Sequence, residues 1–257
     1  MFKPLFFLGM VLVGYLAQFV DGTLGMGYGV FSASLLVSIG LYPVIASASV
    51  HTAEIFTTLL SGVSHFKLGN VKRDLVLSLA IPGVIGGVAG AYFLASVPGK
   101  TIKPFVAAIL LAMGLLILYR VLLQKNPIPS VNKGHSRVKL TLLGLVAGFM
   151  DAVGGGGWGP IATPSLILSG NDEPRQVVGS INLVEFFVTL AETLTFLIMI
   201  GPEAFRWDIV VALLIGGAVA APTAAFLCKK LPQKVLVSLI GVALIGLNIR
   251  TLLQFII

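Results

Sequence analysis

The chain has 257 residues, of which 57% are hydrophobic and only 11% are charged, and its mean hydropathy is +1.02. A water-soluble domain cannot bury that much apolar surface, so the composition excludes a soluble protein and predicts one with lipid as its solvent. A net charge of +7 could indicate a nucleic-acid partner, but Lys and Arg lie in the connections between apolar runs. Retention of positive charge in the cytoplasm explains them there, so we expect no nucleic-acid partner.

Ten apolar segments follow one another along the chain, in two sets of five. They are 5–20, 28–39, 44–66, 75–96 and 102–123, then 140–152, 159–169, 176–200, 208–228 and 233–256. We expect helices, because in hydrocarbon every backbone N–H and C=O must be satisfied within its own segment. The first two segments of each set are shorter than the roughly 20 residues that a span needs. Each such pair therefore predicts either the halves of one discontinuous helix or a re-entrant hairpin.

The two sets repeat each other in sequence. Residues 14–29 (GYLAQFVDGTLGMGYG) match 144–159 (GLVAGFMDAVGGGGWG), and SVHTAEIFTTL from Ser49 matches SINLVEFFVTL from Ser180. The predicted fold is an all-α polytopic membrane protein of two homologous repeats, each a glycine-broken helix or hairpin plus three transmembrane helices. The repeats span 1–123 and 140–257, joined by a basic cytoplasmic linker at 124–139. Because the first segment has an internal counterpart, we expect it to be part of the fold and not a cleaved leader.

The membrane topology is only weakly indicated by positive charge. Counts of Lys and Arg on the two sides barely separate the crossing and hairpin arrangements. The hairpin arrangement places the Lys-rich 229–234 inside and the acidic 201–208 outside. It also gives each half three crossings, an odd number, which predicts inverted repeats in the cell membrane.

The glycine breaks, Asp21 to Gly29 and Asp151 to Gly159, are the sharpest motif. Unwound backbone at membrane depth is tolerated where it is buried or lines a cavity, and glycine N–H groups at a helix N-terminus can bind an anion. The alternative is that the glycines serve close packing or act as hinges. The candidates for binding a small anionic substrate are Gly25, Met26, Gly27, Tyr28, Gly155, Gly156, Gly157, Trp158, Ser49, Ser180 and Asn182.

A polar stripe follows each break at helical spacing. His51, Glu54, Thr58 and Ser61 form one stripe, and Asn182, Glu185, Thr189 and Glu192 form the other. Ionisable residues at this depth are expensive, and a His near a Glu can carry protons, which suggests proton coupling. Alternatively, the two Glu residues at matching positions lock their helices to the broken segments, and the two Asp residues cap half-helices. The candidates for coupling or gating are Asp21, His51, Glu54, Asp151, Glu185 and Glu192.

Other chemistry is not indicated by the sequence. The lone Cys228 excludes an intramolecular disulfide and a thiolate metal site, and no cluster has a recognisable metal-ligand spacing. No Ser or Cys nucleophile has an evident base, so we expect no enzyme, no metal and no cofactor. The GxxxG pairs Gly83/Gly87 and Gly86/Gly90 predict helix contacts, within the chain or in a homodimer.

At the two breaks the chain resembles the TauE/SafE family of sulfite exporters. The resemblance lies in DGTLGMGYGVF with PVIASASVHT, and in DAVGGGGWGPIATPSLIL with PRQVVGSIN. It implies outward transport of small sulfur-containing anions, such as sulfite, sulfoacetate or other organosulfonates, across the cell membrane. The first break departs from a full glycine run at Thr23, Met26 and Tyr28, which leaves the substrate open.

Three classes of function remain compatible with the sequence. The leading one is a secondary anion transporter that works by alternating access, coupled to protons or driven by the membrane potential. A passive anion channel, or a carrier of a different small anion, is the alternative. A membrane-embedded enzyme or assembly factor is disfavoured by the absence of a nucleophile or metal motif.

Overall fold

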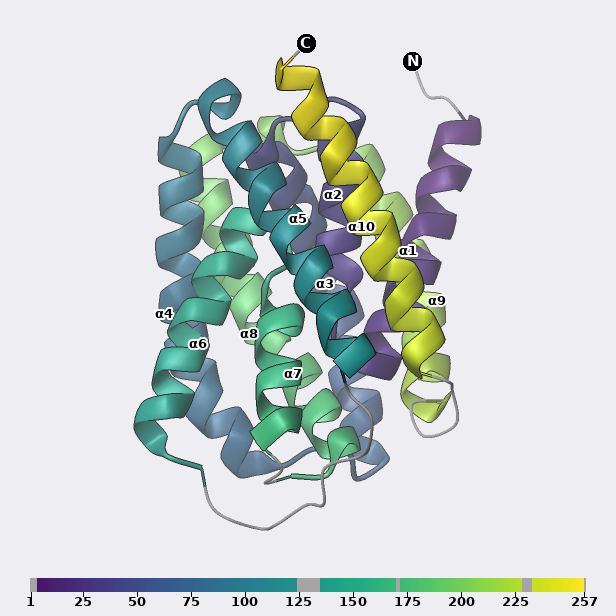
Figure 1. The fold of residues 1–257 in the computed structure, drawn as a ribbon, viewed down its shortest axis with the longest axis vertical. Helices are drawn as coiled ribbons and strands as arrows, with labels where there is room; N and C mark the ends of the chain where they lie inside the picture. Colours follow the sequence, from purple (N-terminus) through teal and green to yellow (C-terminus); the bar gives the residue numbers. More distant parts are fainter. Residues whose placement is uncertain (1–3, 124–134, 170–171, 228–232, 257) are drawn as a thin grey trace.

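A computed structural model describes residues 4–123, 135–169, 172–227 and 233–256. Within these ranges every element of secondary structure is a helix (Figure 1). The helices are α1 (Pro4–Leu24), α2 (Tyr28–Ser38), α3 (Pro43–Lys67), α4 (Arg73–Ser96), α5 (Gly99–Leu123), α6 (Arg137–Gly154), α7 (Trp158–Ser169), α8 (Pro174–Ile200), the 3₁₀ helix η1 (Pro202–Ala204), α9 (Trp207–Leu227) and α10 (Gln233–Ile256).

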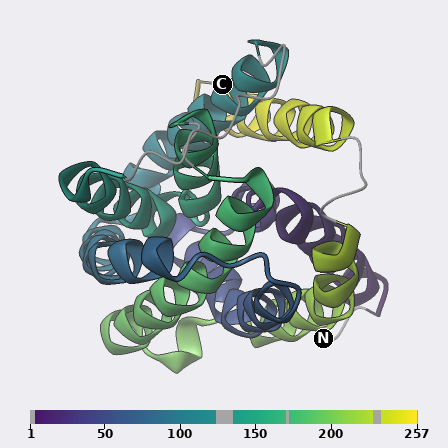
Figure 2. The same ribbon diagram turned by 90° about the horizontal axis from the view of Figure 1, so that it is seen from below.

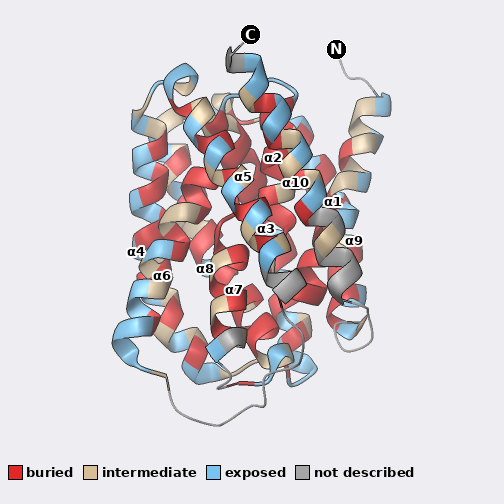
Figure 3. Ribbon diagram, in the orientation of Figure 1, coloured by how far each residue is buried: buried red, intermediate tan, exposed pale blue. Residues whose placement is uncertain are grey.

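Six of the described helices are long and apolar enough to cross a bilayer. They are α1, α3, α4, α5, α8 and α9. Side chains on their outer faces are apolar and exposed, as a lipid-facing surface requires, including Leu8 and Leu12 on α1 and Leu77 and Ile81 on α4. Figure 3 shows this arrangement, with buried residues along the inside of the helices. The prediction of an all-helical, multi-pass membrane protein is confirmed.

The breaks are shorter than the sequence predicts. α1 continues through Asp21 to Leu24 and has 21 residues, so the expectation that this segment is too short to span was wrong. The first break is residues 25–27 and the second break is residues 155–157. Positive φ angles end the helices, at Gly25 (φ 67°) and Gly155 (φ 71°), a conformation that favours glycine.

Each half of the chain packs its fourth helix on the first helix of the other half. α4 lies against α6, and α9 lies against α1. Glycines make the close approach possible, because a Cβ on Gly90 would lie 3.0 Å from the Cα of Phe149 and a Cβ on Gly14 would lie 2.8 Å from the Cα of Leu213. Gly86 of the predicted GxxxG pairs lies against the backbone of Leu145 in the same way. These contacts are therefore internal to the chain.

The middle of the molecule is formed by α3 and α8, which contact each other, while α9 packs on α3 and α4 packs on α8. α3 is the most deeply buried of the six candidate spans. The helices α5 and α10 pair along one side of the molecule, as the views in Figures 1 and 2 agree. For each of these pairings, the equivalent helices of the other half also pack together: α4 on α6 corresponds to α9 on α1, and α8 on α4 corresponds to α3 on α9.

Candidate functional site

The two breaks cross each other at the centre of the molecule. A Cβ built on Gly29 would lie 2.6 Å from the carbonyl oxygen of Gly155, and one built on Gly159 would lie 2.6 Å from the Cα of Met26. Both distances are below any real van der Waals contact of a methyl group. Backbone therefore touches backbone at the crossing, which glycine alone allows.

Several backbone N–H groups at the breaks are paired within the protein. Gly25 N donates to the carbonyl of Asp21 (2.6 Å), and Gly156 N donates to the carbonyl of Asp151 (2.9 Å). Trp158 N, at the start of α7, donates to Oδ1 of Asp151 (3.0 Å). The sequence predicts an oxyanion at this helix N-terminus, and in the structure the carboxylate of Asp151 lies there.

The aromatic residues that follow the breaks are buried and packed. Tyr28 lies 1% exposed, with its backbone N–H facing the carboxylate of Asp21, and its ring packs beside Gly217 of α9. Trp158 lies 0% exposed, packs beside Gly83 of α4, and donates from Nε1 to the carbonyl of Ile181 (3.3 Å). The two rings occupy matching positions on opposite halves of the chain.

The polar stripe of α3 meets α6 and α8 at His51. Its Nδ1 lies 2.7 Å from Oε2 of Glu54, and its Nε2 lies 3.2 Å from Oε2 of Glu192. Nε2 also lies 3.3 Å from the backbone carbonyl of Asp151. The ring of Phe196 lies parallel to the imidazole, 6.5 Å between centroids. One imidazole therefore faces groups from three helices.

The matching positions of the other half hold a neutral pair. Asn182 corresponds to His51, and Ser61 corresponds to Glu192. Ser61 Oγ donates to Oδ1 of Asn182 (2.6 Å), and Asn182 Nδ2 donates to the carbonyl of Val178 (3.1 Å). Equivalent positions of the two halves therefore hold an ionisable His51–Glu192 pair in one case and a neutral, hydrogen-bonded Asn182–Ser61 pair in the other.

Carboxyl groups outnumber compensating groups in this core. Five carboxyl side chains of this core are buried, each at most 4% exposed, and three of them belong to residues that face the imidazole of His51. Each also has at least one oxygen with no hydrogen-bond partner; they are Asp21, Glu54, Asp151, Glu185 and Glu192. A buried, unpaired charge costs several kcal/mol or more, so the cluster requires positive charge from protons or cations.

Two predicted substrate-binding serines have structural partners elsewhere. Ser180 Oγ accepts a hydrogen bond from the backbone N–H of Lys72 (2.8 Å), just before α4. Ser49 Oγ accepts one from the backbone N–H of Arg206 (3.2 Å), just before α9. Each serine therefore holds the start of the other half's fourth helix, and the structure does not bring it to the crossing.

Three polar residues at the crossing were missed by the sequence interpretation. Ser47 Oγ donates to the carbonyl of Ala152 (2.7 Å), Thr163 Oγ1 donates to that of Gly25 (2.5 Å), and His65 Nε2 lies 2.9 Å from that of Gly22. The first two contacts join residues more than a hundred positions apart, so no local spacing could reveal them.

An ionic cluster lies where the chain enters α4, α6 and α8. Asp172, before α8, contacts both Lys72, before α4, and His135, before α6; we call these three residues the Asp172 latch. Burial alone would raise the pKa of Asp172, but the hydrogen bonds and charges of Lys72 and His135 lower it below its usual range. The latch borders a pocket of about 420 Å³ between the first turns of α4 and α6.

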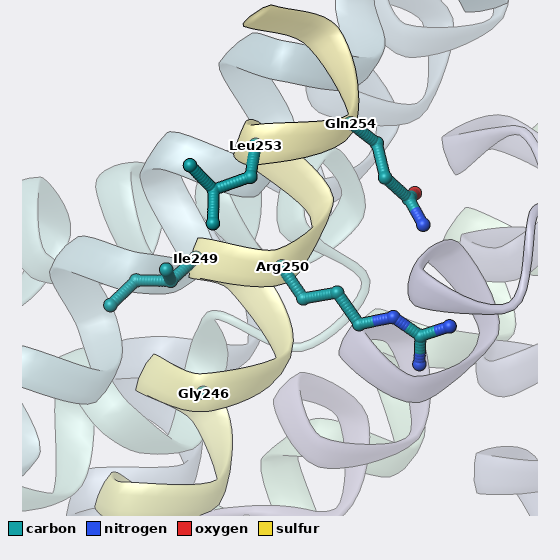
Figure 4. Close-up of a pocket in the computed structure, with 5 residues that line it drawn as sticks. All are labelled: Gly246, Ile249, Arg250, Leu253 and Gln254. Carbon is teal, nitrogen blue, oxygen red and sulfur yellow. The ribbon is translucent and has the colours of Figure 1, made fainter. Parts of the chain in front are cut away.

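A second pocket, of about 510 Å³, runs along α10 (Figure 4). Arg250 and Gln254 point to one side of this helix, and Ile249 and Leu253 point to the other. The pocket is remote from the crossing of the breaks, and none of the predicted site residues lines it.

Comparisons with known proteins agree with this architecture. The family described as Sulfite exporter TauE/SafE matches residues 10–251. The chain is 46% identical to the probable membrane transporter protein YtnM of Bacillus subtilis (strain 168), over 94% of this chain and 81% of the relative. It is 26% identical to the probable membrane transporter protein YdhB of the same organism, over 68% of this chain and 72% of the relative. No solved structure matches the chain. The chain therefore belongs to the sulfite exporter TauE/SafE family of membrane transporters, multi-pass proteins of the cell membrane that are not enzymes.

Proposed function

We propose that this protein is a secondary transporter that exports small sulfur-containing anions across the cell membrane by alternating access. Sulfite, sulfoacetate and other organosulfonates form the proposed substrate class. The observation that carries the proposal is the crossing of two glycine breaks, each followed by a helix N-terminus, in the buried centre of a membrane protein with six candidate spans among its described helices.

The proposed architecture is a pair of inverted repeats with re-entrant hairpins. Figure 1 supports it, because α1 descends from the N-terminus while α6 rises from the opposite end. The exchange of packing partners, α4 on α6 and α9 on α1, also supports it. In such an arrangement the two helix N-termini approach the centre from opposite sides, as a site open alternately to each side requires.

We further propose that the substrate exchanges with the carboxylate of Asp151. That carboxylate accepts a hydrogen bond from Trp158 N at the start of α7, and Asp21 faces Tyr28 N at the start of α2. A sulfonate presents the same acceptor oxygens to the same donors. The substrate therefore takes the place of a tethered anion, so that the donors remain paired before and after transport.

The test is transport by purified protein in liposomes, with sulfite, sulfoacetate, taurine, sulfate and an amino acid as candidate solutes. Saturable movement of the sulfur anions, lost in Gly157→Ala and retained in Gly246→Ala, is expected. A Cβ on Gly157 would lie 2.6 Å from the backbone of Met150, whereas one on Gly246 meets nothing within 4 Å. Imposed pH gradients and membrane potentials in the same assay distinguish proton coupling from potential-driven movement.

Other outcomes of the assay contradict parts of the proposal. Conductance far above carrier rates would identify a passive anion channel. Movement of a different small anion, with no competition from any sulfur anion, would remove the substrate class and leave the transporter.

A further inference from the structure

We propose that His51, Asp151 and Glu192 form a binding site for a divalent first-row metal cation. The three residues belong to α3, α6 and α8, which are far apart in the chain and meet in the centre of the molecule. One ligand atom from each lies within 4.8 Å of the others, and all three side chains are buried. Metal bonds of about 2.0–2.2 Å require these atoms to approach by roughly 1 Å.

The imidazole is oriented as a metal ligand is. Its Nδ1 lies 2.7 Å from Oε2 of Glu54, and in the proposed site the imidazole carries its proton on Nδ1 and donates it to that carboxylate. Nε2 then carries the lone pair, with Oε2 of Glu192 3.2 Å away and the backbone carbonyl oxygen of Asp151 3.3 Å away. Metal-binding histidines characteristically donate their other ring N–H to a carboxylate, which fixes the tautomer and the ring plane. Glu54 is therefore the positioning residue of the site.

The oxygens that face this position lack partners. Neither carboxylate oxygen of Glu192 nor Oδ2 of Asp151 accepts a hydrogen bond from a protein N–H or O–H group, although both side chains are completely buried, and the two carboxyl groups lie within hydrogen-bonding reach of each other. The other oxygen of Asp151 accepts a hydrogen bond from Trp158 N (3.0 Å), which orients the side chain in this state of the protein. Unsatisfied buried carboxylates are rare, because each costs its full desolvation free energy, and a divalent cation compensates two of them at once.

The opposite half of the chain provides an internal comparison. There Asn182 and Ser61 take the places of His51 and Glu192, and they satisfy each other by a hydrogen bond of 2.6 Å. Where both metal-ligating groups are replaced, the position closes on itself. Where they are retained, the carboxylate oxygens of Glu192 accept no hydrogen bond from a protein N–H or O–H group.

The ligand set selects the class of cation. Imidazole nitrogen with two carboxylates suits Zn²⁺, Mn²⁺, Fe²⁺, Co²⁺ or Ni²⁺, whereas Mg²⁺ and Ca²⁺ prefer an all-oxygen shell. The surroundings leave room for the carboxylate of Glu192, because a Cβ on Gly87 would lie 2.6 Å from its Oε1. Phe196, stacked on the imidazole, covers the other side.

The first experiment measures metal carried by the whole protein. The untagged chain is expressed in medium with added Zn²⁺ or Co²⁺, purified in detergent, and its metal content is determined by mass spectrometry. About one ion per chain is expected in the wild type, and bound Co²⁺ should show the visible absorption of a nitrogen- and oxygen-ligated site. Supplying the metal during folding avoids the need for it to enter a closed core.

The variants use residues that the fold already accepts at matching positions. His51→Asn and Glu192→Ser copy the other half, so both should fold, and both should lose the bound ion. Ser61→Ala, at the matching position, should keep it. Glu54→Gln should fold and bind Zn²⁺ with about 10-fold to 100-fold lower affinity, as a positioning role predicts.

Two results would overturn the site. One is a wild-type protein with no more metal than His51→Asn, and the other is metal that survives Glu192→Ser unchanged. Neither outcome depends on anion transport, so the cation site and the proposed transport function stand or fall separately.

Discussion

Gly29 and Gly156 lie backbone against backbone where the two glycine breaks cross, and each occupies the space that a side chain on the other would need. They come from opposite halves of the chain, so at this point the halves meet backbone to backbone. The helix N-termini that the breaks expose are consequently held at a fixed separation.

Replacement of Gly29 by Ala should destabilise the protein. The new methyl group would lie 2.6 Å from the carbonyl oxygen of Gly155 and 3.0 Å from Oε1 of Glu54, and overpacking of this kind costs about 1–3 kcal/mol. Thermal unfolding in detergent, followed by intrinsic fluorescence, checks this. Gly246→Ala, in α10 with nothing within 4 Å, is the control and should be neutral or slightly stabilising. Equal melting temperatures for the two variants would contradict the crossing.

Replacement of Ser180 by Ala should lower stability by about 1 kcal/mol, because the backbone N–H of Lys72 loses its acceptor. Ser49→Ala should do the same through Arg206. Ser64→Ala is the control, since its hydroxyl is exposed and bonds only to its own helix. If instead transport of the substrate is lost while the melting temperature is unchanged, these serines bind substrate as the sequence predicts.

Replacement of Asp172 by Asn should cost about 1–3 kcal/mol at neutral pH, because the ionic contacts of the latch are lost. The pKa of this carboxyl is lower in the folded protein than in the unfolded chain, where it has its ordinary value of about 4. Its contribution is therefore fully present above about pH 4 and is lost as the pH falls through the folded value. The difference in melting temperature between wild type and variant should shrink in acid. Glu173→Gln, at an exposed neighbour, should show a much smaller difference at neutral pH.

Single cysteines should test the inverted arrangement. In a background where Cys228 is replaced by Ala, Tyr42→Cys and Glu173→Cys lie at the matching N-caps of α3 and α8, and both native side chains are exposed. A membrane-impermeant maleimide should label one from outside the cell and the other only from inside. Labelling of both from the same side would contradict inverted repeats.

The helical architecture could be predicted from the sequence, because it depends on hydrophobicity averaged over whole segments and not on individual contacts. Apolar runs, their lengths and their repetition predict helices around the observed bounds, and the glycine runs predict where two of the helices break. The exact break was harder to predict, because Asp21 and Gly22 fit a helix as well as a loop. Only the positive φ of Gly25 decides where α1 ends.

The candidate site was only partly readable. Spacing along α3 and α8 brings out the two polar stripes, since residues three or four apart share a helix face. Helical spacing cannot reveal a cluster whose members come from three different helices, as His51, Asp151 and Glu192 do. These three residues also have no recognisable metal-ligand spacing along the chain. Nor can spacing tell that Ser180 turns toward Lys72 and away from the crossing.

The packing of α1 on α9 determines when this protein can finish folding in the membrane. The face of α1 around Gly14 fits the backbone of α9 near Leu213. During synthesis about two hundred residues separate the two, so α1 enters the bilayer long before its partner exists. Until α9 arrives, lipid must cover a surface shaped for another helix. Folding of the first half is therefore completed by the second half, and the last spans to be made are the ones that fix the first in place.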